Sequence, residues 1–324
     1  MSIQDKKRMR KTYPSRKLAL GFTLIELLVA LAISSVITIA AMSALLVSRQ
    51  GFSMADAASQ LRDNARFSTD IIQRLAVQSG YKDLLYAAKP RLNSEPPNPV
   101  PNINGFNNAV PDSSTPDIAF TTRTAGTLGF GSDVLVLRHQ TSETFPDSGL
   151  SDKSMIDCNG DASAAIPADR DARVVSIFSV ALSSNEPTLM CTTNPGGTWF
   201  SRPLVTGVEN FQVLYGIDTT GAGEVADTYV RADQLTAVSS RAIRSLRIGM
   251  VIRGPLGSAP SAAAQTFYPL GLGKDSDSGT PGFAMSTTDS GASADVGTRF
   301  SPTPDTRLRQ VVTFTVHLRN GQGL

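Results

Sequence analysis

Residues 21–47 read GFTLIELLVALAISSVITIAAMSALLV and contain one charged side chain, Glu26. From Phe22 to Val47 the run is apolar or small enough to lie in lipid, and an α-helix of this length extends over about 39 Å. The hydrocarbon core of a membrane is roughly 30 Å thick. We therefore predict one membrane-spanning helix over residues 22–47.

The charges that flank this run predict its orientation. The chain has 324 residues, with 30 Lys and Arg against 28 Asp and Glu, and a formal net charge of +2. Residues 1–21 hold seven of the basic side chains and only Asp5 to oppose them, so the leader is about +6 and the remainder about −4. The positive-inside rule keeps such a leader in the cytoplasm, so we expect everything after Val47 on the far side of the membrane.

The start of the apolar run allows two kinds of processing. An ordinary secretory signal would be cut after the run, at small residues such as Ala41 to Ala44. The junction GFTLIEL instead resembles the prepilin signature of type IV pilins and type II secretion pseudopilins. This resemblance implies cleavage by the prepilin peptidase between Gly21 and Phe22, N-methylation of Phe22, and a mature chain that keeps the apolar helix.

Glu26 needs a reason to lie in an apolar helix, because an ionised carboxylate in hydrocarbon costs on the order of 3 kcal/mol or more. It either lies near the interface and reaches toward the headgroups, or it has a partner of opposite charge. The pilin resemblance implies the second: Glu26 neutralises the N-terminal ammonium of a neighbouring subunit during assembly.

Helical periodicity continues beyond the apolar run. One helix face is formed by Met54, Ala58, Leu61, Ala65, Ser68, Ile72 and Leu75. We predict a single helix from Phe22 to about Ser79, with a bend at Gly51 and a stop at Gly80.

The chain after Tyr81 has a different character. Many prolines make residues 88–130 a predicted long loop, and the small, polar residues 255–304 a second one. Strand-like runs occupy residues 134–138, 174–181, 211–215, 245–253 and 311–319. The last two alternate apolar and polar side chains, which is typical of strands with one buried face. The predicted fold class is α+β, a long N-terminal helix packed on an antiparallel β-sheet head.

Several segments resemble the PilW family of minor pilins. They are residues 62–81, 157–160, 203–235, 241–254 and 305–320. This resemblance implies a leader over 1–21, a long helix over 22–80 and a periplasmic head over 81–324. It further implies an inner-membrane protein that joins the pilus near its tip, with other minor pilins, the major pilin, the assembly platform and a tip adhesin as partners.

Cys158 and Cys191 are the only cysteines. The predicted topology places both in an oxidising compartment, so we expect one disulfide between them. It would close a loop of about 34 residues and stabilise the head by roughly 3 to 4 kcal/mol. A thiolate for metal binding or catalysis is disfavoured, since neither a second cysteine pair nor a nearby histidine is evident.

Other candidate sites are weak. The acidic loop at 218–227 has Asp218, Glu224 and Asp227, but Thr220 and Ala222 stand where a calcium loop would offer carboxylates, so we predict a turn. We expect His139 and His317 to be solvated or hydrogen-bonded. No zinc-peptidase, serine-hydrolase, P-loop or dinucleotide motif occurs, so we predict no enzyme, cofactor or metal site. An acidic mature chain without a basic, aromatic cluster also argues against nucleic-acid binding.

The leading hypothesis is a minor pilin that primes type IV pilus assembly and joins the tip-proximal complex. A minor pseudopilin of a type II secretion system shares the same junction and is the first alternative. The second alternative is a binding module that presents the 255–304 loop to a tip adhesin or a surface.

Overall fold

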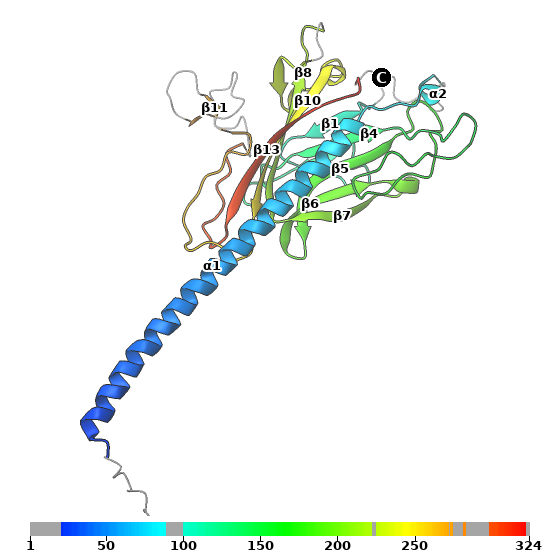
Figure 1. Ribbon diagram of the computed structural model, residues 1–324. Helices are drawn as coiled ribbons and strands as arrows, with labels where there is room; N and C mark the ends of the chain where they lie inside the picture. Colours follow the sequence, from blue (N-terminus) through cyan, green and yellow to red (C-terminus); the bar gives the residue numbers. More distant parts are fainter. Residues whose placement is uncertain are drawn as a thin grey trace, which may run out of the picture. The chain divides into compact units, whose positions relative to one another are not determined.

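The computed structural model describes residues 21–88, 100–221, 225–271, 273–274, 281–282 and 298–321. The chain divides into two compact units, residues 1–51 and 52–324. Helix α1 (Leu24–Gln78) begins in the first unit and ends in the second (Figure 1). Gly51, where we expected a bend, lies within this helix.

The first unit consists of the apolar half of α1. Every described residue from Gly21 to Gly51 is exposed, and by length and composition α1 is the one helix among the described residues that is able to cross a membrane. The polar hydroxyls in this half donate to carbonyl oxygens three or four residues earlier, at Ser34, Ser35, Thr38 and Ser43. The helix therefore satisfies these groups internally, as a lipid environment requires.

The second half of α1 is amphipathic. Its buried face is formed by Ala57, Leu61, Ala65, Ser68, Ile72, Leu75 and Ala76. This face agrees with the predicted stripe from Leu61 onward. The helix ends at Gln78, and Gly80 follows with a φ of 78°, a left-handed conformation that glycine adopts without strain.

The described residues of the head form two large antiparallel sheets where we expected one (Figure 1). The five-stranded sheet has the order β1 (Ile103–Phe106), β4 (Val134–His139), β5 (Val174–Ser183), β6 (Glu186–Thr193) and β7 (Phe200–Thr206). The four-stranded sheet has the order β13 (Arg309–His317), β10 (Ile243–Arg253), β8 (Val208–Ile217) and β9 (Thr228–Val230). Both sheets belong to the second unit.

Smaller elements complete the head. Strand β2 (Ala109–Pro111) pairs with β3 (Phe120–Thr122), and β11 (Gly273–Lys274) pairs with β12 (Pro281–Gly282). Helix α2 (Leu84–Ala87) follows α1, and short 3-10 helices span Pro195–Gly197, Ala232–Gln234 and Ser239–Ala242.

One hydrophobic core joins the second half of α1 to both sheets. It includes Leu61, Ile72 and Leu75 of α1, Phe178 and Leu189 of the five-stranded sheet, and Phe211 and Ile248 of the four-stranded sheet. The predicted α+β architecture, with a helix packed on an antiparallel head, is confirmed by this core. Burial of such side chains contributes about 1.5 to 3 kcal/mol each.

The five predicted strands are present as β4, β5, β8, β10 and β13, and the differences lie elsewhere. Residues 88–130, expected as a loop, contain the three short strands β1, β2 and β3, while residues 89–99 lie outside the described residues. We did not predict β6 and β7, and each of these strands contains a proline, Pro187 or Pro203, which is unfavourable inside a sheet. Of the predicted loop at 255–304, residues 272, 275–280 and 283–297 lie outside the described residues.

The two histidines differ in their surroundings. His317 is exposed, as we expected. His139 is not solvated: it is 2% exposed, and its Nε2 has no hydrogen-bond partner in the part of the chain that the structure describes. Burial lowers the pKa of His139 to about 4, so this imidazole is neutral at physiological pH.

Candidate functional site

The predicted processing and assembly residues lie together at the start of α1. Gly21 and Phe22 precede the helix, and the Phe22 side chain is 86% exposed. Thr23 and Glu26 form a reciprocal capping box. The backbone N–H and the hydroxyl of Thr23 each donate to Glu26 Oε2 at 2.9 Å, and the Glu26 N–H donates to Thr23 Oγ1 at 3.3 Å.

This capping box places the Glu26 carboxylate over the positive end of the helix dipole. The spacing Thr-x-x-Glu is the sequence signature of such a box, and it is present at residues 23–26. We did not assign this local role to Glu26 from the sequence, although the spacing indicates it. Within a single chain, Glu26 already has hydrogen-bond donors.

The remaining surface of this half of α1 is apolar. Exposed leucine, isoleucine and valine side chains cover it from Leu24 to Val47. An uncovered surface of this kind is unfavourable in water and requires lipid or other apolar helices around it.

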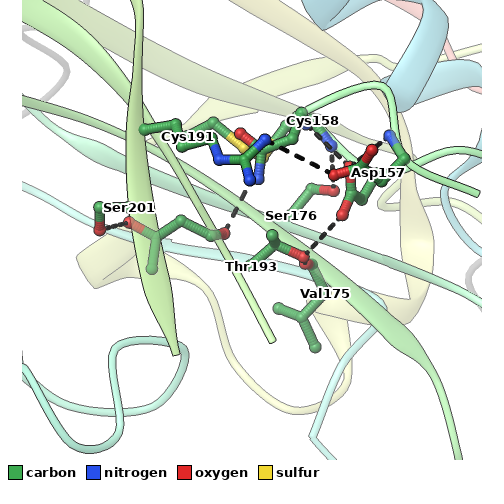
Figure 2. Close-up of a disulfide and its surroundings, with 11 residues drawn as sticks. Asp157, Cys158, Val175, Ser176, Cys191, Thr193 and Ser201 are labelled. Carbon is green, nitrogen blue, oxygen red and sulfur yellow. Dashed lines mark hydrogen bonds and ion pairs between the residues drawn. A yellow bond between two sulfur atoms is a disulfide. The ribbon is translucent and has the colours of Figure 1, made fainter. Parts of the chain in front are cut away.

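The head contains a disulfide between Cys158 and Cys191, whose Cα atoms are 5.7 Å apart (Figure 2). Cys191 lies in β6, and the Cys158 N–H donates to Ser176 Oγ on β5 at 3.1 Å. Both cysteines are fully buried in the core that includes α1. The disulfide therefore fixes the loop around residues 157–160 to the middle of the five-stranded sheet.

Asp157 shapes the loop that carries Cys158. Its Oδ1 accepts hydrogen bonds from the N–H groups of Asn159 and Asp161, at 2.8 and 3.0 Å. Its Oδ2 accepts from Thr193 Oγ1 at 3.2 Å, and Figure 2 shows this contact beside the disulfide. Burial raises the pKa of Asp157 despite these donors. The carboxylate acts as a local scaffold for the loop.

An ionic cluster joins strands that are distant in sequence. Arg253 of β10 bonds Glu209 of β8 at 2.9 Å and Glu186 of β6 at 2.8 Å. Arg309 of β13 bonds Glu209 at 2.6 Å and Asp305 at 2.7 Å. The Arg309 side chain is almost completely buried, and its single positive charge is paired with the carboxylates of Glu209 and Asp305, as a buried charge requires.

The cluster changes the pKa values of its members. A hydrogen bond from Arg309 is the main cause of the lowered pKa of Asp305. At Glu186 burial raises the pKa, but hydrogen bonds and attraction from Arg253 and Arg307 outweigh it and the pKa is lowered. These carboxylates stay ionised well into the acidic range.

The loop at 218–227 satisfies its carboxylates with its own donors. Asp218 Oδ1 accepts from the N–H groups of Thr220 and Gly221, and Asp227 Oδ2 accepts from the N–H and hydroxyl of Thr219. Residues 222–224 of this loop lie outside the described residues. Over the described ranges there is no group of three or more His, Cys, Asp or Glu side chains suited to a metal ion.

Comparisons with known proteins agree with this arrangement. Residues 177–320 match the family described as type IV pilus-assembly protein W, PilW, and residues 16–42 match the prokaryotic N-terminal methylation motif. A type IV-like pilin from Thermus thermophilus is similar in structure, with a TM-score of 0.36 and 14% identity. That similarity covers 81% of this chain and 98% of the other. No curated protein sequence matches this chain.

An N-methylation motif at the start of an apolar helix, followed by an antiparallel head packed on the same helix, defines a type IV pilin. The motif and the exposed apolar helix fit a membrane-anchored protein. The PilW match over residues 177–320 and the N-methylation motif at the start of the helix together support a type IV pilin of the PilW family. Pilins of this family are structural proteins, and the family suggests interaction with other pilins and with the pilus machinery.

Proposed function

We propose that this protein is a minor pilin that primes type IV pilus assembly and becomes part of the tip-proximal minor pilin complex. One observation carries the proposal: the apolar, fully exposed half of α1 is continuous in sequence with a half that is buried in the head. A helix of this kind anchors the subunit in lipid first and packs against the helices of other subunits later.

Removal of the leader would create an N-terminal ammonium group that is able to pair with the Glu26 carboxylate of another subunit. We propose cleavage between Gly21 and Phe22 by the prepilin peptidase, followed by N-methylation of Phe22. In a single subunit, the Thr23 donors stabilise the Glu26 carboxylate at the helix start. When the helix docks in the filament, the carboxylate pairs with the N-terminal ammonium of a neighbouring Phe22. The pairing removes an uncompensated charge from an apolar environment.

The proposed location follows from the same features. The leader, residues 1–21, stays in the cytoplasm, residues 22–47 span the inner membrane, and the head, residues 81–324, is periplasmic before it enters the pilus. The disulfide supports an oxidising compartment for the head. Proposed partners are other minor pilins, the major pilin, the prepilin peptidase, the assembly platform and a tip adhesin.

The test replaces the Glu26 carboxylate in a strain that carries a deletion of this gene. Deletion is expected to abolish surface pili and twitching motility, and the wild-type chain to restore both. Glu26→Ala, present at a normal protein level, is expected to restore neither surface pili nor twitching motility. The control Asp63→Ala removes an exposed carboxylate from the head-bound half of α1 and is expected to restore both pili and motility. Normal piliation with Glu26→Ala would contradict the proposed role of this carboxylate.

The same deletion distinguishes the proposed minor pilin from a minor pseudopilin of a type II secretion system, which would have the same GFTLIEL junction. A minor pseudopilin would leave pili intact and block protein secretion. A deletion that abolishes secretion while pili form normally would therefore replace the proposed function by this alternative.

A further inference from the structure

A cavity of about 510 Å³ lies beside the ionic cluster of the head. Its lining consists of the loop of residues 126–130, residues 299–303, and the cluster members Glu209, Arg253, Asp305 and Arg309. Glu209 and the Arg309 side chain are almost completely buried, whereas Arg299 and Thr303 are exposed. The cluster therefore forms the floor of the cavity, and the two segments form its mouth. Sites for small molecules span about 300 to 1,000 Å³, so this cavity is large enough for one.

Both segments at the mouth are held in place by the head itself. The loop of residues 126–130 surrounds the buried guanidinium of Arg123, whose Nη1 donates to the Leu128 carbonyl at 3.0 Å and whose Nε donates to the Ala109 carbonyl at 2.9 Å. In the other segment, Phe300 and Phe267 exchange two backbone hydrogen bonds of 2.8 and 2.9 Å. Because these segments are already ordered, a ligand would bind without a large loss of conformational entropy.

The floor of the cavity carries no net charge. Its ion pairs join three arginines, Arg253, Arg307 and Arg309, to three carboxylates, Glu186, Glu209 and Asp305. Arg309 makes five hydrogen bonds, as many as a guanidinium has N–H groups. The carboxylates of Glu209 and Asp305 are therefore neutralised from below, and they repel a negatively charged ligand only weakly.

Arg299 adds the one uncompensated charge of the lining. Its guanidinium has no hydrogen bond or ion pair within the part of the chain that the structure describes. Arg253 makes three hydrogen bonds, so two of its N–H groups are also without an acceptor among the described residues. A guanidinium fork binds a carboxylate through two parallel hydrogen bonds. A net charge of +1 matches one carboxylate, whereas a phosphate monoester carries nearly two negative charges at neutral pH.

The same cavity offers apolar surface. Phe130 belongs to one of its segments and Phe300 to the other, and both rings are half-buried. Ligand sites commonly combine such aromatic walls with a few polar groups that fix the orientation of the ligand. The two rings therefore favour a ligand that has an apolar group beside its negative charge.

We propose that this cavity binds a monocarboxylate with an apolar group next to the charged end. Arg299 and the free N–H groups of Arg253 hold the carboxylate, and Phe130 and Phe300 contact the apolar group. Two sources offer this chemistry: a free organic acid, and the C-terminal end of a protein chain whose last residue is apolar. The inference goes beyond the proposed function, and neither depends on the other.

The test is isothermal titration calorimetry on the full chain, purified in detergent, at low ionic strength. The probe is N-acetyl-phenylalanine, and its uncharged amide is the matched control, since the amide enters detergent micelles at least as well. We expect the acid to bind and the amide to bind about tenfold more weakly or less. A short peptide that ends in phenylalanine distinguishes the sources: tighter binding than the free probe assigns a chain end, and equal or weaker binding a free acid.

Two exposed positions at the mouth locate the ligand without disturbing the core. Arg299→Gln should lower the affinity for the acid about tenfold, whereas Arg62→Gln, at an exposed arginine of α1, should not. Thr303→Glu, which cancels the net charge, should also weaken binding, and Thr303→Gln is its uncharged control. The proposal is overturned if the acid does not bind, if acid and amide bind equally, if inorganic phosphate binds more tightly than the acid, or if Arg299→Gln and Thr303→Glu leave the affinity unchanged.

Discussion

Removal of the disulfide should destabilise the head substantially. The perturbation is the double substitution Cys158→Ala and Cys191→Ala. Alanine is preferable to serine because both positions are fully buried, and a serine hydroxyl there would need a hydrogen-bond partner. The first half of α1 belongs to the other unit and should keep its helical structure.

The magnitude follows from the loop that the disulfide closes. The cysteines are 33 residues apart in sequence, and the chain-entropy relation gives a loss of about 4 kcal/mol in the free energy of unfolding for a loop of that size. For a domain of this size, each kcal/mol lowers Tm by roughly 2 to 4 °C, so the expected decrease is about 8 to 15 °C.

The assay is thermal unfolding of the full chain in detergent, followed by the fluorescence of Trp199, the single tryptophan. Trp199 packs against a buried cluster of the five-stranded sheet and should report on that sheet. Reduced wild-type protein is the matched control, because it keeps both sulfur atoms and lacks only the crosslink. A loss below about 1 kcal/mol would refute the reasoning: the hydrogen bonds of Asp157 would then hold the loop without the disulfide.

Three further predictions concern the rest of the head. Asp305 and Glu186 have lowered pKa values in the folded head. Their ion pairs therefore contribute fully to the free energy of unfolding above the ordinary carboxyl pKa of about 4, and this contribution is lost as the pH falls through the pKa values of the folded state. Urea unfolding at pH 7 and at pH 3 will measure the loss. Asn320→Ala removes an amide that donates to three carbonyl oxygens at the end of α1 and should cost about 1 kcal/mol, with faster hydrogen exchange in the last turn; unchanged exchange would contradict this contact. Gly249→Ala would drive a methyl group into the Pro269 carbonyl oxygen and should cost about 1 to 3 kcal/mol by thermal unfolding, while a neutral result would mean that the segment at Pro269 moves aside freely.

Local signals account for the parts of the fold that the sequence predicted. Gly80 marks the end of α1 because the chain there has a positive φ, which glycine adopts without strain. The even-numbered side chains from Leu246 to Ile252 in β10 and from Val312 to Val316 in β13 face the core and are apolar, while most of the odd-numbered ones between them are polar or small, so the side chains alternate visibly along both strands. Strand β8 is buried throughout, so only its most apolar part, residues 211–215, was recognisable.

Long-range contacts account for most of what was missed. The ionic cluster brings Glu186, Glu209, Arg253 and Arg309 together from four separate strands, and no spacing in the sequence indicates that they meet. The outer position of β7 permits Pro203 in a strand, and that position is a property of the sheet order. The capping box of Thr23 and Glu26, by contrast, is a local contact, and its Thr-x-x-Glu signature is visible in the sequence.

The central claim is that residues 1–21 are removed on the cytoplasmic side and that the apolar helix stays in the mature protein. Mass spectrometry of the N-terminal peptide, from protein purified from its own envelope, tests this claim most directly. The account predicts a mature chain that begins with N-methylated Phe22 and contains all of residues 22–47. An N-terminus at Met1, or one created after the apolar run near Ala41 to Ala44, would contradict it.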